Sequence, residues 1–256
     1  MTDADGAIYV YGVIAGSDRT DIESAGVGSS DTPVRRVAYD GVAALVSDIP
    51  RGPLAAARDL RAHWRVLEEA AAETTVLPVQ FGTVMESEEA VRDSLLAPNA
   101  ERLEALLDAL ADKVQLTVKG FYDEEQLLRE IVNEAPAVAR MRERTQRLPE
   151  AASYYDRIRL GELVSAEVDR RRARDAELVL GRLEPLAAAA KAEPVTGKDG
   201  AFAAAFLVPR QGIDDFSRAV KGLADELSDR IRIRYVGPLP PYSFADDEAV
   251  GAGTWA

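Results

Sequence analysis

The sequence predicts an α+β fold with two domains, long helices and a proline-rich C-terminal tail that docks on the body of the protein. Short runs of β-branched and aromatic residues alternate with longer segments of helical periodicity. The chain has 256 residues, which suffices for one large domain or two small ones. In the segment 237–244, three prolines in four positions exclude a helix and favour a stiff, extended path.

The first predicted elements are strands. The run 7–15 is rich in β-branched and aromatic residues, which is typical of a buried strand. The next two strands, over 34–39 and 42–47, flank Asp40 and Gly41. This dipeptide indicates a hairpin, because the favoured two-residue turns need positive φ angles.

A helix is predicted over 54–73, because four apolar residues recur at helical spacing along it. These residues are Leu60, Trp64, Leu67 and Ala71. A fourth strand is expected over 76–84, at a sheet edge, since Pro78 has no backbone donor. Two more helices follow, the first with Ser87 as its N-cap; they span 87–96 and 100–110.

The second half of the chain begins with a strand over 114–119, whose alternation of apolar and polar residues predicts one wet face. A long helical region is expected over 123–191, with interruptions near Pro136 and Pro149.

The remaining elements are a hairpin, a helix with Asp214 and Asp215 in its first turn, and a last strand. Their ranges are 193–196 and 201–208 for the hairpin, 213–227 for the helix and 230–236 for the strand. The resulting β-α-β-β-α-β order is that of a ferredoxin-like domain. We therefore expect an N-terminal α+β domain over 1–112, a ferredoxin-like domain with an elongated helical connection over 113–236, and a tail over 237–256.

The composition of the chain disfavours several classes of protein. The net charge of −13 disfavours binding to nucleic acid or to an anionic bilayer. The absence of cysteine excludes disulfides and thiolate zinc sites. The acidic N-terminus lacks the features of a signal peptide, and the longest apolar run, 201–208, is far shorter than the ~20 residues that span a bilayer. We expect a soluble, cytoplasmic protein.

No residue pattern indicates catalysis. His63, the single histidine, lies off the expected apolar stripe of its helix, which predicts a solvated side chain. Gly26 and Gly28 begin a dinucleotide fingerprint that lacks its third glycine. Carboxylate clusters are expected on solvated faces, and the arginines at 170–174 can pair with interleaved acids. We expect no catalytic residue, no metal site, no cofactor and no enzymatic activity.

Two groups of residues are candidates for docking either the tail or a partner. One is a row of arginines about 7 Å apart on one face of the last strand. The alternative is that this face of the strand lies in solvent and docks nothing. The other is a set of apolar side chains on the stiffened tail, which lose little conformational entropy on docking. The residues are Arg230, Arg232 and Arg234 in the strand, and Leu239, Tyr242 and Phe244 in the tail.

Several segments, taken in order, resemble the gas vesicle protein F/L family (GvpF/GvpL). The most specific are the LP-x-x-FGT pattern over 77–83 and the GP-x-PPYSF pattern over 237–244. The weaker ones lie at 8–13, 42–47, 63–68 and 118–120. The chain departs from the family pattern at Gln80, where arginine is common, and at Leu239, where tryptophan is common.

The resemblance implies two ferredoxin-like-type α+β domains and a tail that packs back on the body. It also implies a cytoplasmic accessory protein that binds the small, hydrophobic main shell protein of gas vesicles and assists its ordered assembly. Other gas vesicle accessory proteins are further expected partners, and some family members become minor vesicle components. We expect binding first at the N-terminal sheet and its loops, and second at the tail.

Two other functions compete with this one. A small-molecule-sensing ferredoxin-like regulatory module is the first alternative, because domains of this fold often bind small molecules. An enzyme that uses the clustered carboxylates is the second.

Overall fold

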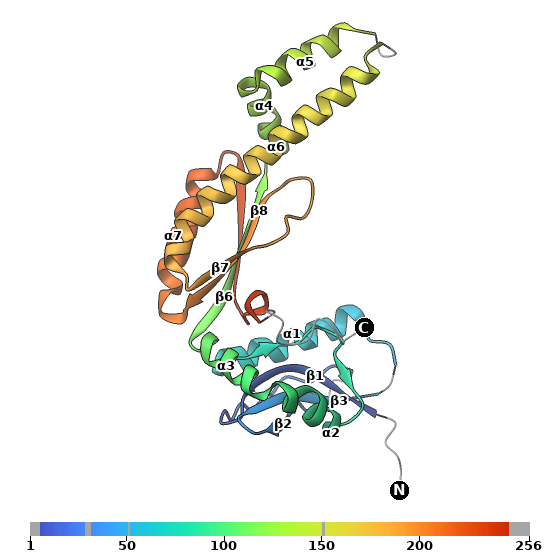
Figure 1. Ribbon diagram of the computed structural model, residues 1–256, viewed down its shortest axis with the longest axis vertical. Coiled ribbons are helices and arrows are strands. Elements are labelled where there is room, and N and C mark those ends of the chain that lie inside the picture. Colours follow the sequence, from blue (N-terminus) through green and yellow to red (C-terminus); the bar gives the residue numbers. More distant parts are fainter. Residues whose placement is uncertain (1–5, 29–31, 51, 150–151, 246–256) are drawn as a thin grey trace. The chain divides into compact units, whose positions relative to one another are not determined.

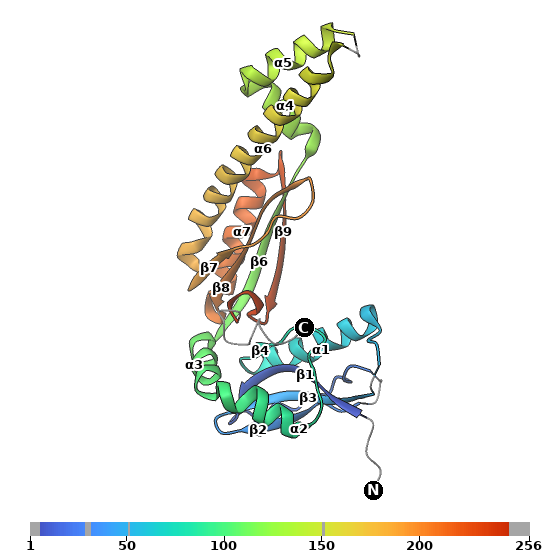
Figure 2. The same ribbon diagram turned by 45° about the vertical axis from the view of Figure 1, so that its right-hand side comes forward.

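The computed structural model describes residues 6–28, 32–50, 52–149 and 152–245, and combines helices with two sheets. The chain divides into two compact units (Figures 1 and 2). The first unit comprises residues 1–115 and 238–256, and the second comprises 116–237. The second unit is therefore inserted into the first.

The sheet of the first unit has the strand order β2-β3-β1-β4, and β5 also pairs with β1. The strands are β1 (Gly6–Ala15), β2 (Arg35–Tyr39), β3 (Val42–Pro50), β4 (Leu77–Pro78) and β5 (Val84–Met85). The predicted hairpin between β2 and β3 is confirmed, with Asp40 at the positive φ of 48°. Pro78 lies in the last strand of the order, at the sheet edge as predicted.

The single strand predicted over 76–84 is wrong. Two strands of two residues each replace it, and both pair with β1. Between them the chain turns through Gly82, whose φ of 94° is unfavourable for other residues. This turn moves Phe81 off the sheet and toward the helix, where it becomes part of the candidate site described below.

Helices contact both faces of this sheet, so β1 is buried along nearly its whole length (Figure 2). α1 (Ala56–Glu73) packs on one face. The other helical segments follow one another: α2 (Glu88–Ala90), a π-helix (Val91–Leu96), a 3-10 turn (Ala97–Asn99) and α3 (Ala100–Leu110). Ser87 caps α2 as predicted, since its Oγ accepts a hydrogen bond from Ala90 N at 3.1 Å.

The apolar stripe predicted on α1 is displaced. Leu60 is 39% exposed, whereas the buried face of the helix is formed by Ala62, Val66, Leu67 and Ala70. His63 belongs to this buried face, because it lies three and seven residues before Val66 and Ala70. The prediction that His63 is solvated is therefore wrong.

The second unit is built on a four-stranded sheet with the order β7-β8-β6-β9. Its strands are β6 (Lys113–Tyr122), β7 (Ala189–Ala192), β8 (Gly200–Pro209) and β9 (Ile231–Leu239). Its helices are α4 (Glu124–Glu134), α5 (Pro136–Arg147), α6 (Tyr154–Leu183) and α7 (Ile213–Leu227). Figures 1 and 2 show α7 and the second half of α6 side by side along the sheet.

The predicted breaks in the long helical region are confirmed, since α5 begins at Pro136 and ends before Pro149. Helix α7 is also confirmed, with Phe216, Val220 and Leu223 buried. The first hairpin strand lies earlier than predicted: Ala189–Ala192 pairs with β8, and 193–199 forms the loop.

The wet face predicted for β6 is wrong. Gln115 and Thr117 are only 4% and 6% exposed. For Gln115 the cause is a non-local contact, because its Oε1 accepts a hydrogen bond from Ser243 N at 2.8 Å. Nothing within residues 114–119 indicates this partner, which lies more than a hundred residues away in the sequence.

The last strand is longer than predicted, because β9 continues through Gly237 and Pro238 to Leu239. The chain then turns, and Tyr242–Phe244 forms a single 3-10 turn. The expected extended path therefore applies only to the beginning of the proline-rich segment.

Candidate functional site

A buried aromatic cluster lies between the sheet and α1 of the first unit. It consists of Tyr9 and Tyr11 from β1, His63 from α1 and Phe81 from the turn between β4 and β5. The His63 ring is stacked on Tyr11 with centroids 5.7 Å apart, and meets Phe81 edge-on at 5.6 Å. Only 1% of His63 is exposed.

Burial and one hydrogen-bond contact define the surroundings of this histidine. Tyr9 Oη lies 3.0 Å from His63 Nδ1 and also accepts a hydrogen bond from Gly82 N at 3.1 Å. The Nε2 atom of His63 is buried and has no hydrogen-bond partner among the described residues. Burial lowers the pKa of His63 from 6.5 to about 4, because the charged imidazolium would lose its hydration.

The second tyrosine of the cluster holds a loop. Tyr11 Oη lies 2.8 Å from Ser47 Oγ and accepts a hydrogen bond from Val27 N at 2.6 Å. Burial raises the pKa values of both Tyr9 and Tyr11. The cluster thus ties the loops around Val27 and Gly82 to the sheet.

The tail contacts the first unit through its aromatic residues. Tyr242 lies against Trp64 of α1 with ring centroids 4.9 Å apart, and it packs on the core of the unit. Phe244 is 9% exposed, and Leu239 is half-buried at the end of β9. The Tyr242 hydroxyl is buried and makes no hydrogen bond within the described part of the chain.

The three candidate arginines have different surroundings. Arg230 precedes β9, and its two terminal nitrogens donate to the buried carboxylate of Asp175 at 2.7 and 2.6 Å. Asp175 also accepts a hydrogen bond from Tyr122 Oη at 2.7 Å. Arg232 and Arg234 are exposed, and the Arg232 guanidinium lies 5.7 Å from the centre of the Phe121 ring. Arg230 is therefore a structural residue.

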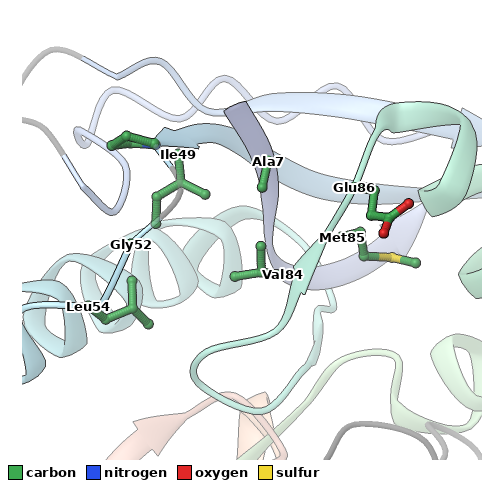
Figure 3. A pocket seen from close by; sticks show the side chains of 8 residues that line it. Ala7, Ile49, Gly52, Leu54, Val84, Met85 and Glu86 are labelled. Carbon is green, nitrogen blue, oxygen red and sulfur yellow. The ribbon is translucent and has the colours of Figure 1, made fainter. Parts of the chain in front are cut away.

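An apolar pocket of about 320 Å³ opens in the first unit (Figure 3). Its walls come from four separate segments: the start of β1, the end of β3, the chain before α1 and β5. The lining residues are Ala7, Ile49, Pro50, Gly52, Leu54, Val84, Met85 and Glu86. Figure 3 shows the side chains of Ile49, Leu54 and Val84 around the opening. Sequence reasoning missed this pocket, because its walls are distant in sequence.

The residues that line the pocket are suited to binding apolar groups. Apolar side chains line most of the pocket, together with the carboxylate of Glu86, and Val84 is 43% exposed at its edge. Such a pocket accepts apolar groups, each worth about 1.5–3 kcal/mol when fully buried. Among the described residues, no cluster of His, Asp or Glu side chains is placed to hold a metal ion. Within that same part of the chain, no helix has the length and apolarity needed to cross a bilayer.

Comparisons with known proteins agree with one another. The family model described as "Gas vesicle synthesis protein GvpL/GvpF" matches residues 7–246. Gas vesicle protein F from Streptomyces sp. (strain CB03234) is 36% identical over 241 residues, which cover 93% of this chain and 99% of the relative. The predicted resemblance is thus confirmed.

Two crystal structures are similar to the fold. Gas vesicle protein GvpF from Anabaena sp. PCC7120 matches with a TM-score of 0.80 and 28% identity, over 94% of this chain and 98% of that one. GvpF from Microcystis aeruginosa matches with a TM-score of 0.77 and 27% identity, over 94% and 99%.

Proposed function

Because the chain belongs to the gas vesicle synthesis protein GvpL/GvpF family, we propose that it binds the hydrophobic main shell protein and assists its ordered assembly into gas vesicles. It acts in the cytoplasm by binding, without turnover of a substrate. Other gas vesicle accessory proteins are further partners, and the protein either leaves the vesicle or stays as a minor component.

The observation that carries this proposal is the apolar pocket of the first unit. A shell subunit needs an apolar surface toward the gas, and such a surface aggregates when it is exposed to water. A pocket lined by Ile49, Leu54 and Val84 can cover part of that surface, since these side chains offer apolar contact to aliphatic groups. The net charge of −13 keeps the resulting complex soluble.

The fold supports the family's expected architecture. In the second unit, β6, the α4–α6 region, β7, β8, α7 and β9 follow the β-α-β-β-α-β order. We infer that this unit is ferredoxin-like with an elongated first connection, and that the first unit is a more distant variant of the same type. In this proposal Tyr242 and Phe244 hold the tail on the first unit.

The test is a binding measurement between this protein and the main shell protein, with one charged substitution in the pocket. Val84→Glu places a carboxylate at the pocket edge, where burial against an apolar partner is costly. We expect at least a tenfold loss of copurified or crosslinked shell protein.

The matched control is Val195→Glu, because Val195 is similarly exposed (40%) but lies in the second unit. Both variants should keep the wild-type melting temperature, since both side chains lie partly in solvent. Equal shell binding by the two variants would exclude the pocket, and no complex with the wild-type protein would refute the proposed function itself.

A further inference from the structure

Three helical segments of the second unit form an arm that extends beyond its sheet (Figures 1 and 2). The arm consists of α4, α5 and the first half of α6, which pack on one another. Arg171 of α6 donates to Glu130 at 3.2 Å and to Glu134 at 2.7 Å, both on α4. Arg144 of α5 pairs with Asp156 of α6 at 2.9 Å. These ion pairs connect α6 to both shorter helices.

The most exposed large apolar side chains of the described residues gather at the end of this arm. Tyr155, Tyr154 and Ile158 are 83%, 63% and 47% exposed, and all three lie in the first two turns of α6. Their spacing of three and four residues places Ile158 beside both tyrosines on the helix surface. Scattered exposed apolar residues are normal, but a group of this kind marks a contact surface.

The charge at the arm end is opposite to that of the whole chain. Residues 136–160 contain six arginines and three acidic residues, a net charge of +3 in a protein whose total is −13. The side chains of Arg140, Arg142 and Arg159 make no ion pair within the described part of the chain. Farther along α6, by contrast, Arg170 and Arg172 pair with Glu167 and Asp169.

We propose that the arm-end surface, formed by Tyr154, Tyr155 and Ile158 of α6 together with the exposed Arg159 of α6 and Arg140 and Arg142 of the adjoining α5, docks an acidic segment of another protein. Tyrosine and arginine are the residue types enriched at protein interfaces, and tyrosine is ordered there at little entropic cost. The arginines attract carboxylates over about one Debye length, ~8 Å, and the rings then supply apolar contact.

Charge also argues against two other binding partners for this surface, a second copy of the chain and an anionic bilayer. In a symmetric dimer that pairs two arm ends, the net charge of +3 on each end would repel the other. An anionic bilayer repels the rest of the protein, because the net charge of the whole chain is −13. The proposal is independent of the shell-binding pocket, which lies in the other unit.

The test is photo-crosslinking in cells that form gas vesicles, with benzoylphenylalanine in place of Tyr155. We expect a product with a second protein, and mass spectrometry should map the link to a segment of net negative charge. The combined substitutions Arg140→Gln, Arg142→Gln and Arg159→Gln should reduce this product at least fivefold, because they remove the attraction and leave the apolar residues intact.

The control places the same photoreactive residue at Tyr39, which is 38% exposed in the first unit. The same product from that position would show a non-specific contact and overturn the proposal. So would a link to a second copy of the chain, to lipid or to a segment without acidic residues, and so would the absence of any product. Shell binding by the pocket can succeed or fail without changing these outcomes.

Discussion

Protonation of His63 should destabilise the folded protein between pH 7 and pH 5. The pKa of the buried imidazole is lowered from 6.5 to about 4. Between these two pH values the imidazole is protonated in the unfolded chain and neutral in the folded protein. The stability that depends on the neutral ring is therefore complete above pH 6.5 and is lost as the pH falls toward 4.

The magnitude follows from the two pKa values. A shift of one unit corresponds to about 1.4 kcal/mol, so the whole difference is worth about 3 kcal/mol. At pH 5 roughly 2 kcal/mol of this should already be lost. Asp59 and Glu69, whose pKa values are lowered in the folded state, add losses mainly below their ordinary range near pH 4.

The assay is urea unfolding of the wild-type protein and of His63→Gln at pH 7 and pH 5. Glutamine does not titrate, so the stability of the variant should lack this part of the pH dependence, whatever its absolute value. Since His63 is the single histidine, its imidazole signal can also be titrated directly by NMR. Equal losses in both proteins, or an imidazole pKa near 6.5 in the folded state, would refute the burial argument.

Three further predictions concern stability, each measured by urea unfolding. Tyr242→Ala should cost about 2–4 kcal/mol through lost packing, whereas Tyr242→Phe should cost almost nothing because the buried hydroxyl has no partner; a large loss in the Phe variant would contradict this. Asp175→Asn should cost about 3–5 kcal/mol, since Arg230 loses its charged partner, and an unchanged midpoint would mean that the pair contributes nothing. Gly12→Ala should cost about 1–3 kcal/mol, because the added carbon would lie 2.7 Å from Leu77 O; wild-type stability would show that the strands adjust freely.

Local sequence patterns were enough to predict most elements, as the periodicity of α7 and the Asp-Gly turn of the β2–β3 hairpin show. It failed on α1, where alanines and other small or apolar residues allow two stripes, one through Leu60 and one through Ala62, Val66 and Ala70. Only packing against the sheet selects the second stripe and buries His63. In β7, alanine favours a helix in isolation, and pairing with β8 overrides that preference.

The candidate sites were predictable to different degrees. Tyr242 and Phe244 were predicted as docking residues from the sequence, because aromatic side chains on a stiff, proline-rich tail favour packing against an apolar surface. The pocket around Val84 was not predictable, since four separate segments have to meet to form it. The ion pair between Arg230 and Asp175 links residues more than fifty positions apart, which strand alternation cannot reveal.

The insertion of one unit into the other has a consequence for biosynthesis. The ribosome makes residues 7–115 first, but the segment at 238–245 that covers Trp64 and binds Gln115 emerges only after the whole inserted unit. The first unit is therefore completed only after the second unit has been synthesised. We expect a chain that ends before residue 238 to expose Trp64 more than the finished molecule does, because Tyr242 is then missing.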